Sequence, residues 1–289
     1  MNNRKGIILA GGLGTRLYPM TICTSKQLLP VYDKPMIYYP ISVLMLSGIK
    51  EILIITSQKD LEQFKSLLHD GSQWGIEIYY KIQPKPEGLA QALILAEDFL
   101  NGCPSILILG DNIFFGNKLS ELLIKTSNSN FKCTIFGYHV ANPERYGVIN
   151  FKDEKPISIE EKPLNPKSNF AIPGLYFFDS SASLRAKKIT PSKRGELEII
   201  DLIKSYLEDK TLNVEIMGRG FTWFDTGTQN SLLDASNFIS SIFNRQRLII
   251  GSPDEVALRL GFIDKKKLSE YLSKFNDNVY YNSLKKLIE

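Results

Sequence analysis

The chain has 289 residues, of which 43% are apolar, and a net charge of +4 from 35 basic and 31 acidic side chains. This composition indicates one large α/β domain or two smaller ones and excludes a disordered chain. The balanced charge also excludes the strongly basic composition typical of nucleic-acid-binding or membrane-surface proteins, so we expect neither kind of partner.

In the first part of the chain, short apolar runs alternate with amphipathic stretches. The apolar runs predict buried strands at residues 5–10, 51–56, 77–82 and 105–109. The stretches between them predict helices at residues 36–47, 60–68 and 88–100. Apolar strands that alternate with helices are typical of a parallel sheet covered on both faces. We therefore predict a Rossmann-like, mostly parallel central sheet flanked by helices.

Beyond Asp111 the pattern changes, because fewer helical stretches separate the strand-like runs. These runs, at residues 132–140, 148–151, 157–161 and 170–178, predict mixed or antiparallel additions to the sheet. In one of them, alternation places Ile157, Ile159 and Glu161 on the same face. From Thr228 onward the sequence predicts mostly helices, with the lysines at 265–267 on a solvated helix face.

Cysteine and histidine usage narrows the possible chemistry. Cys23, Cys103 and Cys133 are widely spaced and form no C-x-x-C pair, which argues against a zinc site or a disulfide framework. A reducing, cytoplasmic location fits best, and we find neither a signal-peptide core nor an apolar run as long as a membrane span. With only His69 and His139 present, histidine-based catalysis is disfavoured.

A glycine-rich loop, L-A-G-G-L-G-T-R-L-Y-P at residues 9–19, follows the first predicted strand. A Rossmann dinucleotide loop would need a third glycine where Leu17 stands, and a Walker loop would need a Lys-Ser/Thr pair that is absent. Two interpretations stay open from these residues alone. The backbone N–H groups from Gly11 to Thr15 form an anion-binding nest to which Arg16 adds donors, or the glycines only allow a tight turn.

This loop and the segment S-K-Q-L-L-P-V-Y-D-K-P-M-I-Y-Y-P after it are similar to the signature of sugar-1-phosphate nucleotidyltransferases. Within that family the chain resembles bacterial glucose-1-phosphate thymidylyltransferases most. The segments that carry this closer resemblance are DGSQWG, QPKPEGLAQAL, LGDNIFFG, PERYGV, EEKP and WFDTGT. The resemblance runs from residue 5 to about residue 265 and is specific, since many residues recur at fixed spacings.

The resemblance implies Mg²⁺-dependent transfer of dTMP from dTTP to α-D-glucose 1-phosphate, giving dTDP-glucose and pyrophosphate for dTDP-rhamnose-type deoxysugar synthesis. The attacking phosphate has a second pKa of about 6 and is ionised at neutral pH, so the reaction needs no general base. Its difficulty is anion repulsion, about 4 kcal/mol for two unit charges 4 Å apart at an effective dielectric near 20. Positioned cations must offset that repulsion.

The resemblance assigns three catalytic cations and two metal ligands. Arg16 would clamp the triphosphate, Lys26 would lie near the α-phosphate, and Lys162 would bind the sugar phosphate. Asp111 and Asp225 would hold Mg²⁺, a hard ion that prefers a few carboxylates, phosphate oxygens and water.

The positions of the two carboxylates also have interpretations that do not depend on the resemblance. Asp111 follows the predicted strand at 105–109, at the end where ligands of open α/β sheets bind. Asp225 would serve equally well as the cap of the following helix, although Thr226 or Thr228 would fill that role too.

The resemblance also assigns the nucleotide-binding positions, which are Leu9, Gly11, Gly12, Gly14, Thr15, Arg16, Lys26, Gln27, Gln83, Gly88 and Asp111. The Gln83 amide offers donors and acceptors to a pyrimidine edge, and Gly88 lets the base approach the backbone. Without the resemblance, both would be read as parts of an ordinary polar loop. Thymine and uracil differ by one methyl, worth about 1–3 kcal/mol, so we expect some use of UTP. A UTP–glucose-1-phosphate uridylyltransferase is therefore the alternative enzyme.

The sugar-phosphate positions that the resemblance assigns are Asn112, Tyr146, Gly147, Glu161, Lys162 and Ile172. Strict strand alternation would send Glu161 and Lys162 to opposite sides, so we expect the strand to bend before Pro163. Pro173 and Ile200 depart from the family pattern, in which a small hydroxyl residue and a threonine are expected. These departures put the range of sugars in question rather than the activity.

The resemblance further predicts two domains and a regulatory region. Residues 1–246 would form the α/β domain, with a nucleotide-binding part to about residue 111 and a sugar-binding part at 112–227. Residues 247–289 would form a helical region for contacts in a homotetramer. Glu255, Val256 and Arg259 belong either to a second nucleotide site there or to an amphipathic surface helix.

A catalytically silent sugar-nucleotide sensor is the alternative from a different class of function. Such a protein would have lost a metal carboxylate or the loop arginine. Arg16, Lys26, Asp111 and Asp225 are all present, which favours the enzyme.

Overall fold

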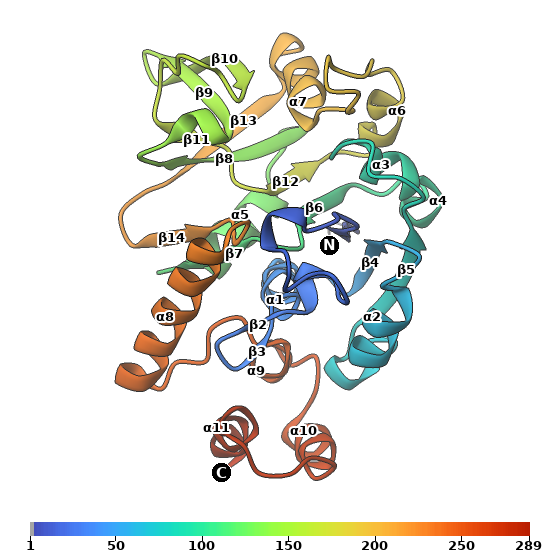
Figure 1. Cartoon of the computed structure of the whole chain (residues 1–289), viewed down its shortest axis with the longest axis vertical. Coiled ribbons are helices and arrows are strands. Elements are labelled where there is room, and N and C mark those ends of the chain that lie inside the picture. Colours follow the sequence, from blue (N-terminus) through green and yellow to red (C-terminus); the bar gives the residue numbers. More distant parts are fainter. Residues whose placement is uncertain (1–2) are drawn as a thin grey trace.

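Four strands from the first part of the chain form the parallel portion of a large sheet in the computed structural model, which describes residues 3–289 (Figure 1). They are β1 (Lys5–Ala10), β4 (Glu51–Thr56), β5 (Glu77–Ile82) and β6 (Ser105–Leu109). β1 pairs in parallel with β4 and β6, and β4 pairs in parallel with β5. All four match the predicted ranges, because each is a short run rich in the β-branched and aromatic residues that strands favour.

The second part of the chain extends this sheet beyond β6, as predicted, with mixed strand directions. The added strands are β8 (Cys133–His139), β9 (Gly147–Lys152), β10 (Lys155–Glu161), β11 (Phe170–Ala171), β12 (Leu175–Phe178) and β13 (Leu212–Met217). The order across the sheet is β10-β9-β11-β8-β12-β6-β1-β4-β5, and β13 pairs in parallel with β8. β12 joins the two portions, since it pairs antiparallel with both β6 and β8.

Two predicted elements are each divided in the structure. The strand expected at 170–178 is β11 and β12, because Pro173 between them has no N–H for the ladder. The helix expected at 88–100 is α3 (Gln91–Leu95) and α4 (Glu97–Leu100). It begins late because the backbone N–H of Ala90 donates instead to the carbonyl of Leu197, at 3.0 Å.

The prediction that Ile157 shares the buried face of its strand is wrong. The pairing of β10 with β9 is irregular between Pro156 and Ser158. The irregularity leaves Ile157 57% exposed, whereas Ile159 is 2% exposed. The apolar alternation of this strand therefore holds only after the bulge.

Helices cover both faces of the sheet. One face packs against α1 (Tyr38–Leu46), α2 (Leu61–Leu68) and α5 (Leu119–Ser127). The other face packs against α3, α4, α6 (Ala182–Ala186) and α7 (Ile199–Glu208). Neighbouring residues of β1 show the two faces, because Ile8 belongs to the first core and Ile7 to the second. This arrangement confirms the predicted fold class.

Two small sheets and several short 3-10 turns in the structure were not predicted. The sheets are β2 (Pro30–Val31) with β3 (Lys34–Pro35), and β7 (Ile113–Gly116) with β14 (Phe221–Phe224). The 3-10 turns are η1 (Thr15–Leu17), η2 (Lys26–Leu28), η3 (Ser72–Trp74) and η4 (Pro143–Arg145). The glycine loop therefore leads into η1, whereas a Rossmann dinucleotide loop would open a long helix.

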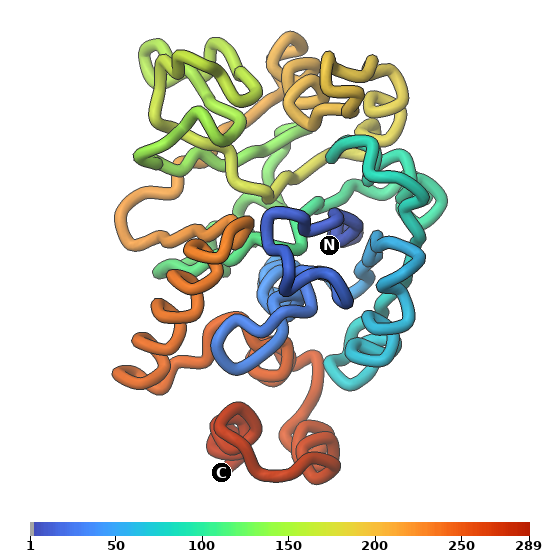
Figure 2. Tube along the Cα trace, viewed as in Figure 1, coloured from blue at the N-terminus to red at the C-terminus, as the bar shows by residue number. Residues whose placement is uncertain are grey.

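The last part of the described chain is helical, as predicted: α8 (Gln229–Gln246), α9 (Pro253–Arg259), α10 (Lys265–Leu272) and α11 (Val279–Ile288). Figure 2 shows α10 and α11, in red, at the end of the molecule opposite β9 and β10. The lysines at 265–267 are exposed, as expected. Within residues 3–289, no helix has the length and apolar character needed to cross a membrane.

Candidate active site

A cavity of about 410 Å³ opens at the carboxyl end of β6, where ligands of open α/β sheets bind. Its charged lining residues come from five separate segments and are Arg16, Asp111, Arg145, Glu161, Lys162 and Asp225. Aliphatic and aromatic side chains, among them Leu89, Ile172, Ile200 and Trp223, line the rest. The fold thus brings together residues that the sequence motifs place more than a hundred positions apart.

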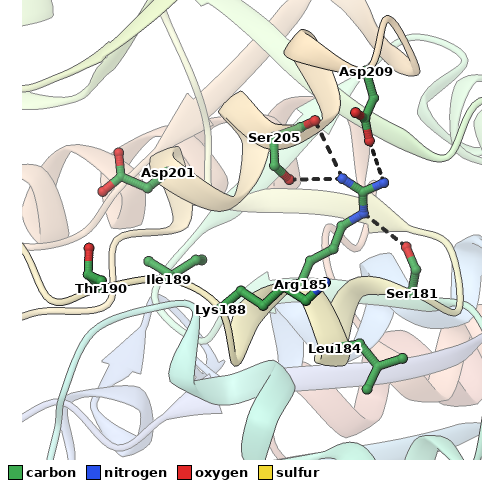
Figure 3. A pocket seen from close by; sticks show the side chains of 9 residues that line it. All are labelled: Ser181, Leu184, Arg185, Lys188, Ile189, Thr190, Asp201, Ser205 and Asp209. Carbon is green, nitrogen blue, oxygen red and sulfur yellow. Dashed lines mark hydrogen bonds and ion pairs between the residues drawn. The ribbon is translucent and has the colours of Figure 1, made fainter.

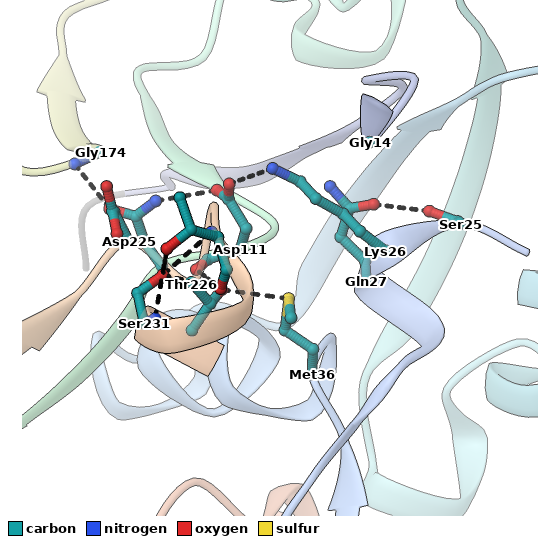
Figure 4. Close-up of polar contacts among 12 residues, drawn as sticks. Gly14, Ser25, Lys26, Gln27, Met36, Asp111, Gly174, Asp225, Thr226 and Ser231 are labelled. Atoms are coloured by element: carbon teal, nitrogen blue, oxygen red, sulfur yellow. Dashed lines mark hydrogen bonds and ion pairs between the residues drawn. The ribbon is translucent and has the colours of Figure 1, made fainter. Parts of the chain in front are cut away.

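Asp111, the first carboxylate of this cavity, lies in the turn between β6 and β7. Its Oδ2 contacts Nζ of Lys26, and its Oδ1 accepts a hydrogen bond of 2.9 Å from the side chain of Asn112 (Figure 4). The side chains of Lys26 and Asp111 are only 13% and 14% exposed. Such limited contact with water strengthens the attraction between them compared with a surface pair.

Asp225, the second carboxylate, follows β14 directly. Its Oδ2 accepts hydrogen bonds from Arg145 at 3.2 Å and from the Tyr146 hydroxyl at 3.0 Å. Burial, together with the Asp225 charge, raises the pKa of Tyr146 to about 12, so this hydroxyl donates at neutral pH. Asp225 is not needed as a helix cap, since Thr228 caps α8 in a capping box with Ser231.

The two carboxylates fit a divalent cation of the Mg²⁺ type. Among residues 3–289, no group of three or more His, Cys, Asp and Glu side chains is placed to hold a metal ion. Mg²⁺ is usually held by one or two carboxylates together with phosphate oxygens and water, and Asp111 and Asp225 line one cavity. In this structure, Lys26 and Arg145 balance the charge of these carboxylates.

The glycine loop lies beside the turn that follows β14. A Cβ atom on Gly227 would lie 2.8 Å from Nη2 of Arg16, so this glycine makes room for the guanidinium group. Gln229 Nε2 donates to the carbonyl of Arg16 at 3.0 Å. Gly14 has a φ of 64°, which glycine adopts without strain. The glycine loop is therefore packed against, and hydrogen-bonded to, the segment that follows Asp225.

The other predicted positions of the loop lie on either side of these contacts. Leu9 is in β1, and Thr15 begins η1. Gly12 is exposed, and a Cβ atom there would meet nothing within 4 Å. Gln27, in η2, is 2% exposed and accepts a hydrogen bond from Ser25 at 2.5 Å.

The two positions expected to recognise the base differ in what surrounds them. Gln83 is 5% exposed, and its Nε2 donates to Gln91 at 2.6 Å, which fixes the direction of its amide. Its Oε1 lies against Gly11, only 2.0 Å from where a Cβ would stand. Gly88, at φ 108°, is needed because a Cβ there would lie 2.5 Å from the backbone of Leu197. The close approach of the Leu197 backbone therefore explains why position 88 is a glycine.

The residues expected to bind the sugar phosphate all line the cavity. β10 ends at Glu161, and Lys162 adopts a φ of 44° while its N–H donates to Tyr146 at 3.0 Å. This turn brings Glu161 and Lys162 to the same cavity, so the expected bend is confirmed. Asn112 accepts hydrogen bonds from Trp223 Nε1 at 2.6 Å and from the Gly174 N–H at 3.0 Å, which fixes its side chain.

The sequence did not indicate the roles of four residues that the structure places in or beside the site, and it suggested Thr226 only as a possible helix cap. Arg145 and Trp223 line the cavity, Arg194 pairs with Glu161 at 3.1 Å, and Thr226 bonds to the backbone of Asp111. Arg145 lies in PERYGV, while Trp223 and Thr226 lie in WFDTGT, so these motifs contained the signal. Arg194 carried no comparable signal, because its partner comes from a distant strand.

A second cavity, of about 370 Å³, lies between α1 and α9. Glu255, Val256 and Arg259 all line it, and Arg259 pairs with Glu255 at 3.6 Å. Burial raises the pKa of Glu255. Tyr39 and Gly251 complete this part of the wall, so α9 here faces a cavity rather than only solvent.

Larger cavities exist elsewhere but offer less chemistry. One of about 610 Å³ lies beside α6 and α7, around Arg185 (Figure 3). Each nitrogen of that guanidinium group already donates to Ser181, Ser205 or Asp209, and the group stacks on Tyr206 at 4.2 Å. We therefore place the candidate site at the smaller cavity, where cations and carboxylates converge.

Comparisons with known proteins agree with the resemblance seen in the sequence motifs. A family model described as nucleotidyl transferase matches residues 5–242. The glucose-1-phosphate thymidylyltransferase of Neisseria meningitidis serogroup A is 52% identical over 286 residues, which is 99% of each chain. The enzyme of that name from Xanthomonas campestris pv. campestris strain B100 is 53% identical over 281 residues, 97% of this chain and 95% of the relative.

A solved structure gives the same picture. It is a Bacillus anthracis protein assigned as a glucose-1-phosphate thymidylyltransferase and crystallised with sucrose. It is 41% identical to this chain and has a TM-score of 0.76, covering 81% of this chain and 94% of its own.

Proposed function

The chain belongs to the nucleotidyl transferase family, and we propose that it transfers dTMP from dTTP to α-D-glucose 1-phosphate, releasing dTDP-glucose and pyrophosphate. The observation that carries this proposal is one cavity lined by Arg16, Asp111, Lys162 and Asp225, in a chain about half identical to proteins named for that reaction. Lys26 joins the group through its contact with Asp111. The same cavity holds the cations that a reaction between two anions requires.

In the proposed reaction, an oxygen of the sugar phosphate attacks the α-phosphorus of dTTP, and the bond from that phosphorus to the β-phosphate oxygen breaks. Lys162 binds the attacking phosphate, Lys26 lies near the α-phosphate, and Arg16 holds the departing pyrophosphate. These side chains align the reactants, which contributes up to roughly 7–11 kcal/mol toward the barrier. Their charges balance the negative charge that moves from one phosphate to the next.

We propose that Asp111 and Asp225 hold the divalent cation, which would be Mg²⁺. When bound, Mg²⁺ supplies Lewis-acid stabilisation of phosphate oxygens. Tyr146 keeps Asp225 directed at the cavity, and Asn112 does the same for Asp111. Lys26 and Arg145, which balance these carboxylates in this structure, are then available to the phosphates.

Substrate recognition uses the flanks of the cavity. Glu161 binds sugar hydroxyls, while Tyr146, Gly147 and Ile172 shape the glucose site. The Gln83 amide, held by Gln91, presents its edge beside Gly11 to the pyrimidine. Discrimination of dTTP from UTP rests on one methyl group, worth about 1–3 kcal/mol, so UTP is used more slowly.

We further propose a homotetramer in which residues 247–289 make subunit contacts, while residues 1–246 form the catalytic domain. The cavity lined by Glu255, Val256 and Arg259 is proposed as a second, regulatory nucleotide site. The free cysteines support a reducing, cytoplasmic location, in which the product would serve deoxysugar synthesis.

The test is pyrophosphate release with glucose 1-phosphate and Mg²⁺, comparing dTTP with UTP, ATP, CTP and GTP. The expected result is fastest release with dTTP and loss of release in Asp111→Asn. Fastest release with UTP would assign the protein as a uridylyltransferase with the same mechanism. Nucleotide binding without release from any of them would contradict the enzyme and support a sugar-nucleotide sensor.

A further inference from the structure

Thr226 lies opposite Asp111 at the end of the small sheet that β7 and β14 form. In that antiparallel pair, Phe224 is the partner of Ile113. Continuing the register by two residues on each strand places Thr226 opposite Asp111. The Thr226 hydroxyl donates to the Asp111 carbonyl at 2.5 Å. A side chain therefore continues the connection between the two segments beyond the last backbone pair of the ladder.

The backbone of Thr226 is held in an unusual conformation. Its φ is 32°, in the left-handed region that β-branched residues rarely adopt, and the residue is 0% exposed. Its hydroxyl also lies 3.3 Å from Sδ of Met36, just before α1 (Figure 4). Strained backbone of this kind persists where the surroundings determine it, and such positions cluster at functional sites.

This conformation places the neighbours of Thr226 on different parts of the site. Asp225, on one side, lines the cavity and meets Arg145 and Tyr146. Gly227, on the other side, makes room for the Arg16 guanidinium group. Thr226 is thus bonded to the backbone of one carboxylate residue and is the chain neighbour of the other.

We propose that Thr226 is a positioning residue that fixes the separation of the Asp111 and Asp225 carboxylates for one divalent cation. The inference rests on the metal pair in the proposed function. Mg²⁺ demands near-ideal ligand geometry, so a small shift of one carboxylate relative to the other weakens the site. Residues that orient metal ligands without touching the ion commonly change metal affinity by about 10–100-fold when replaced.

The experiment compares Thr226→Val, which keeps the shape and loses the hydroxyl, with Thr226→Ser, which keeps the hydroxyl. The matched control is Thr126→Val in α5, because Thr126 is also buried (1% exposed) and donates its hydroxyl to a carbonyl, that of Leu122, at 2.8 Å. Mn²⁺ binding to each full-length protein is measured by the electron paramagnetic resonance of the free ion. The titration is made without ligands and again with dTTP, because phosphate oxygens complete the ligands of such an ion. No sugar phosphate is present in either titration, so the readout is independent of turnover.

The expected result is a dissociation constant for Mn²⁺ raised about 10-fold or more in Thr226→Val, and little changed in Thr226→Ser and Thr126→Val. Thermal unfolding shows whether each variant is folded, and Thr226→Ala replaces the valine variant if that protein is not.

An unchanged dissociation constant for Mn²⁺ in the hydroxyl-free variant would overturn the proposal, as would an equal change in Thr126→Val. Absence of Mn²⁺ binding to the unmodified protein in both titrations, without ligands and with dTTP, would overturn the metal pair and this proposal together. If dTDP-glucose formation fails while the predicted binding pattern is seen, only the proposed substrates are wrong.

Discussion

Nζ of Lys26 lies against Oδ2 of Asp111, so a cation proposed for the α-phosphate and a carboxylate proposed for the metal form one largely buried pair. We predict that Lys26→Met lowers kcat for pyrophosphate release by about 100-fold or more, the usual effect of removing one group that stabilises transition-state charge. It also leaves Asp111 without its cation, so the melting temperature falls.

The control for this prediction is Lys187→Met. Lys187 pairs with Glu97 at 2.5 Å, but both side chains are 40% exposed or more. An exposed pair contributes little, so kcat and the melting temperature should stay close to those of the unmodified protein. Equal kcat values in the two variants would contradict the catalytic role of Lys26.

Two adjacent glycines of the loop give a second prediction, because their surroundings differ. A Cβ on Gly11 would lie 2.0 Å from Gln83 Oε1, whereas a Cβ on Gly12 would meet nothing within 4 Å. Gly11→Ala should therefore lower the melting temperature without any ligand, since Gln83 and its partner Gln91 must move. Gly12→Ala should leave it unchanged.

The same pair of variants tests the nucleotide site. If the open space at Gly12 receives the phosphates of the nucleotide, Gly12→Ala raises KM for dTTP in the absence of any loss of stability. Steady-state kinetics and thermal unfolding of both variants check the prediction. A Gly12→Ala variant with unchanged KM for dTTP would place the nucleotide elsewhere.

The parallel strands could be predicted from the local sequence, and the motifs could be recognised in it. The pairings between distant segments could not be predicted. β1, β4, β5 and β6 are recognisable because each is a short apolar run between breaks. The pairing of β7 with β14 joins segments about a hundred residues apart, and no local pattern indicates it. Thr226 and Trp223 acquire their roles through that pairing, so their motif was recognised while their functions were not.

Single residues also changed what the patterns had indicated. Pro173 divides one expected strand, and the bulge before Ser158 turns Ile157 to solvent. The bend at Lys162 was predictable, because the proline that follows disfavours continued regular structure. Arg145 was not assigned, since its partner Asp225 is distant in sequence.

The buried carboxyl of Asp254 predicts a pH dependence of stability. It is 2% exposed and accepts hydrogen bonds from Trp74 at 3.0 Å and Tyr280 at 2.6 Å, and burial raises its pKa. The folded state then holds this proton more tightly than the unfolded state. Consequently, the free energy of unfolding falls as pH rises from the unfolded pKa, about 4, through the raised folded value, by about 1.4 kcal/mol per pKa unit.

Asp254→Asn removes this titration and keeps an acceptor for Trp74. Its stability relative to the unmodified protein should therefore increase with pH across that window, as measured by urea unfolding. Asp70→Asn is the control of opposite sign, because hydrogen bonds from Ser72 lower the pKa of the exposed Asp70. For this control, the stability of the unmodified protein relative to Asp70→Asn should increase as pH rises. A relative stability of Asp254→Asn that declines with pH would contradict the prediction.

The apolar wall around Ile200 leads to a prediction on sugar range. Cδ1 of Ile200 lies 2.6 Å from where a Cβ on Gly147 would stand, and Cδ1 of Ile172 lies 3.5 Å from it. All three residues line the proposed sugar site. A sugar hydroxyl that faces this wall loses water and gains no protein partner, at a cost of about 1–3 kcal/mol.

At least one monodeoxyglucose 1-phosphate should therefore equal or exceed glucose 1-phosphate in kcat/KM, namely the analogue that lacks the hydroxyl facing Ile200. Ile200→Thr places a hydroxyl group on the wall and should shift the preference toward glucose 1-phosphate by about 10-fold, the equivalent of one hydrogen bond. Ile200→Val has nearly the same shape as the threonine variant but stays apolar, so it should not shift the preference. If every deoxy analogue is a much poorer substrate than glucose 1-phosphate, then each hydroxyl has a polar partner and Ile200 does not determine the range of sugars.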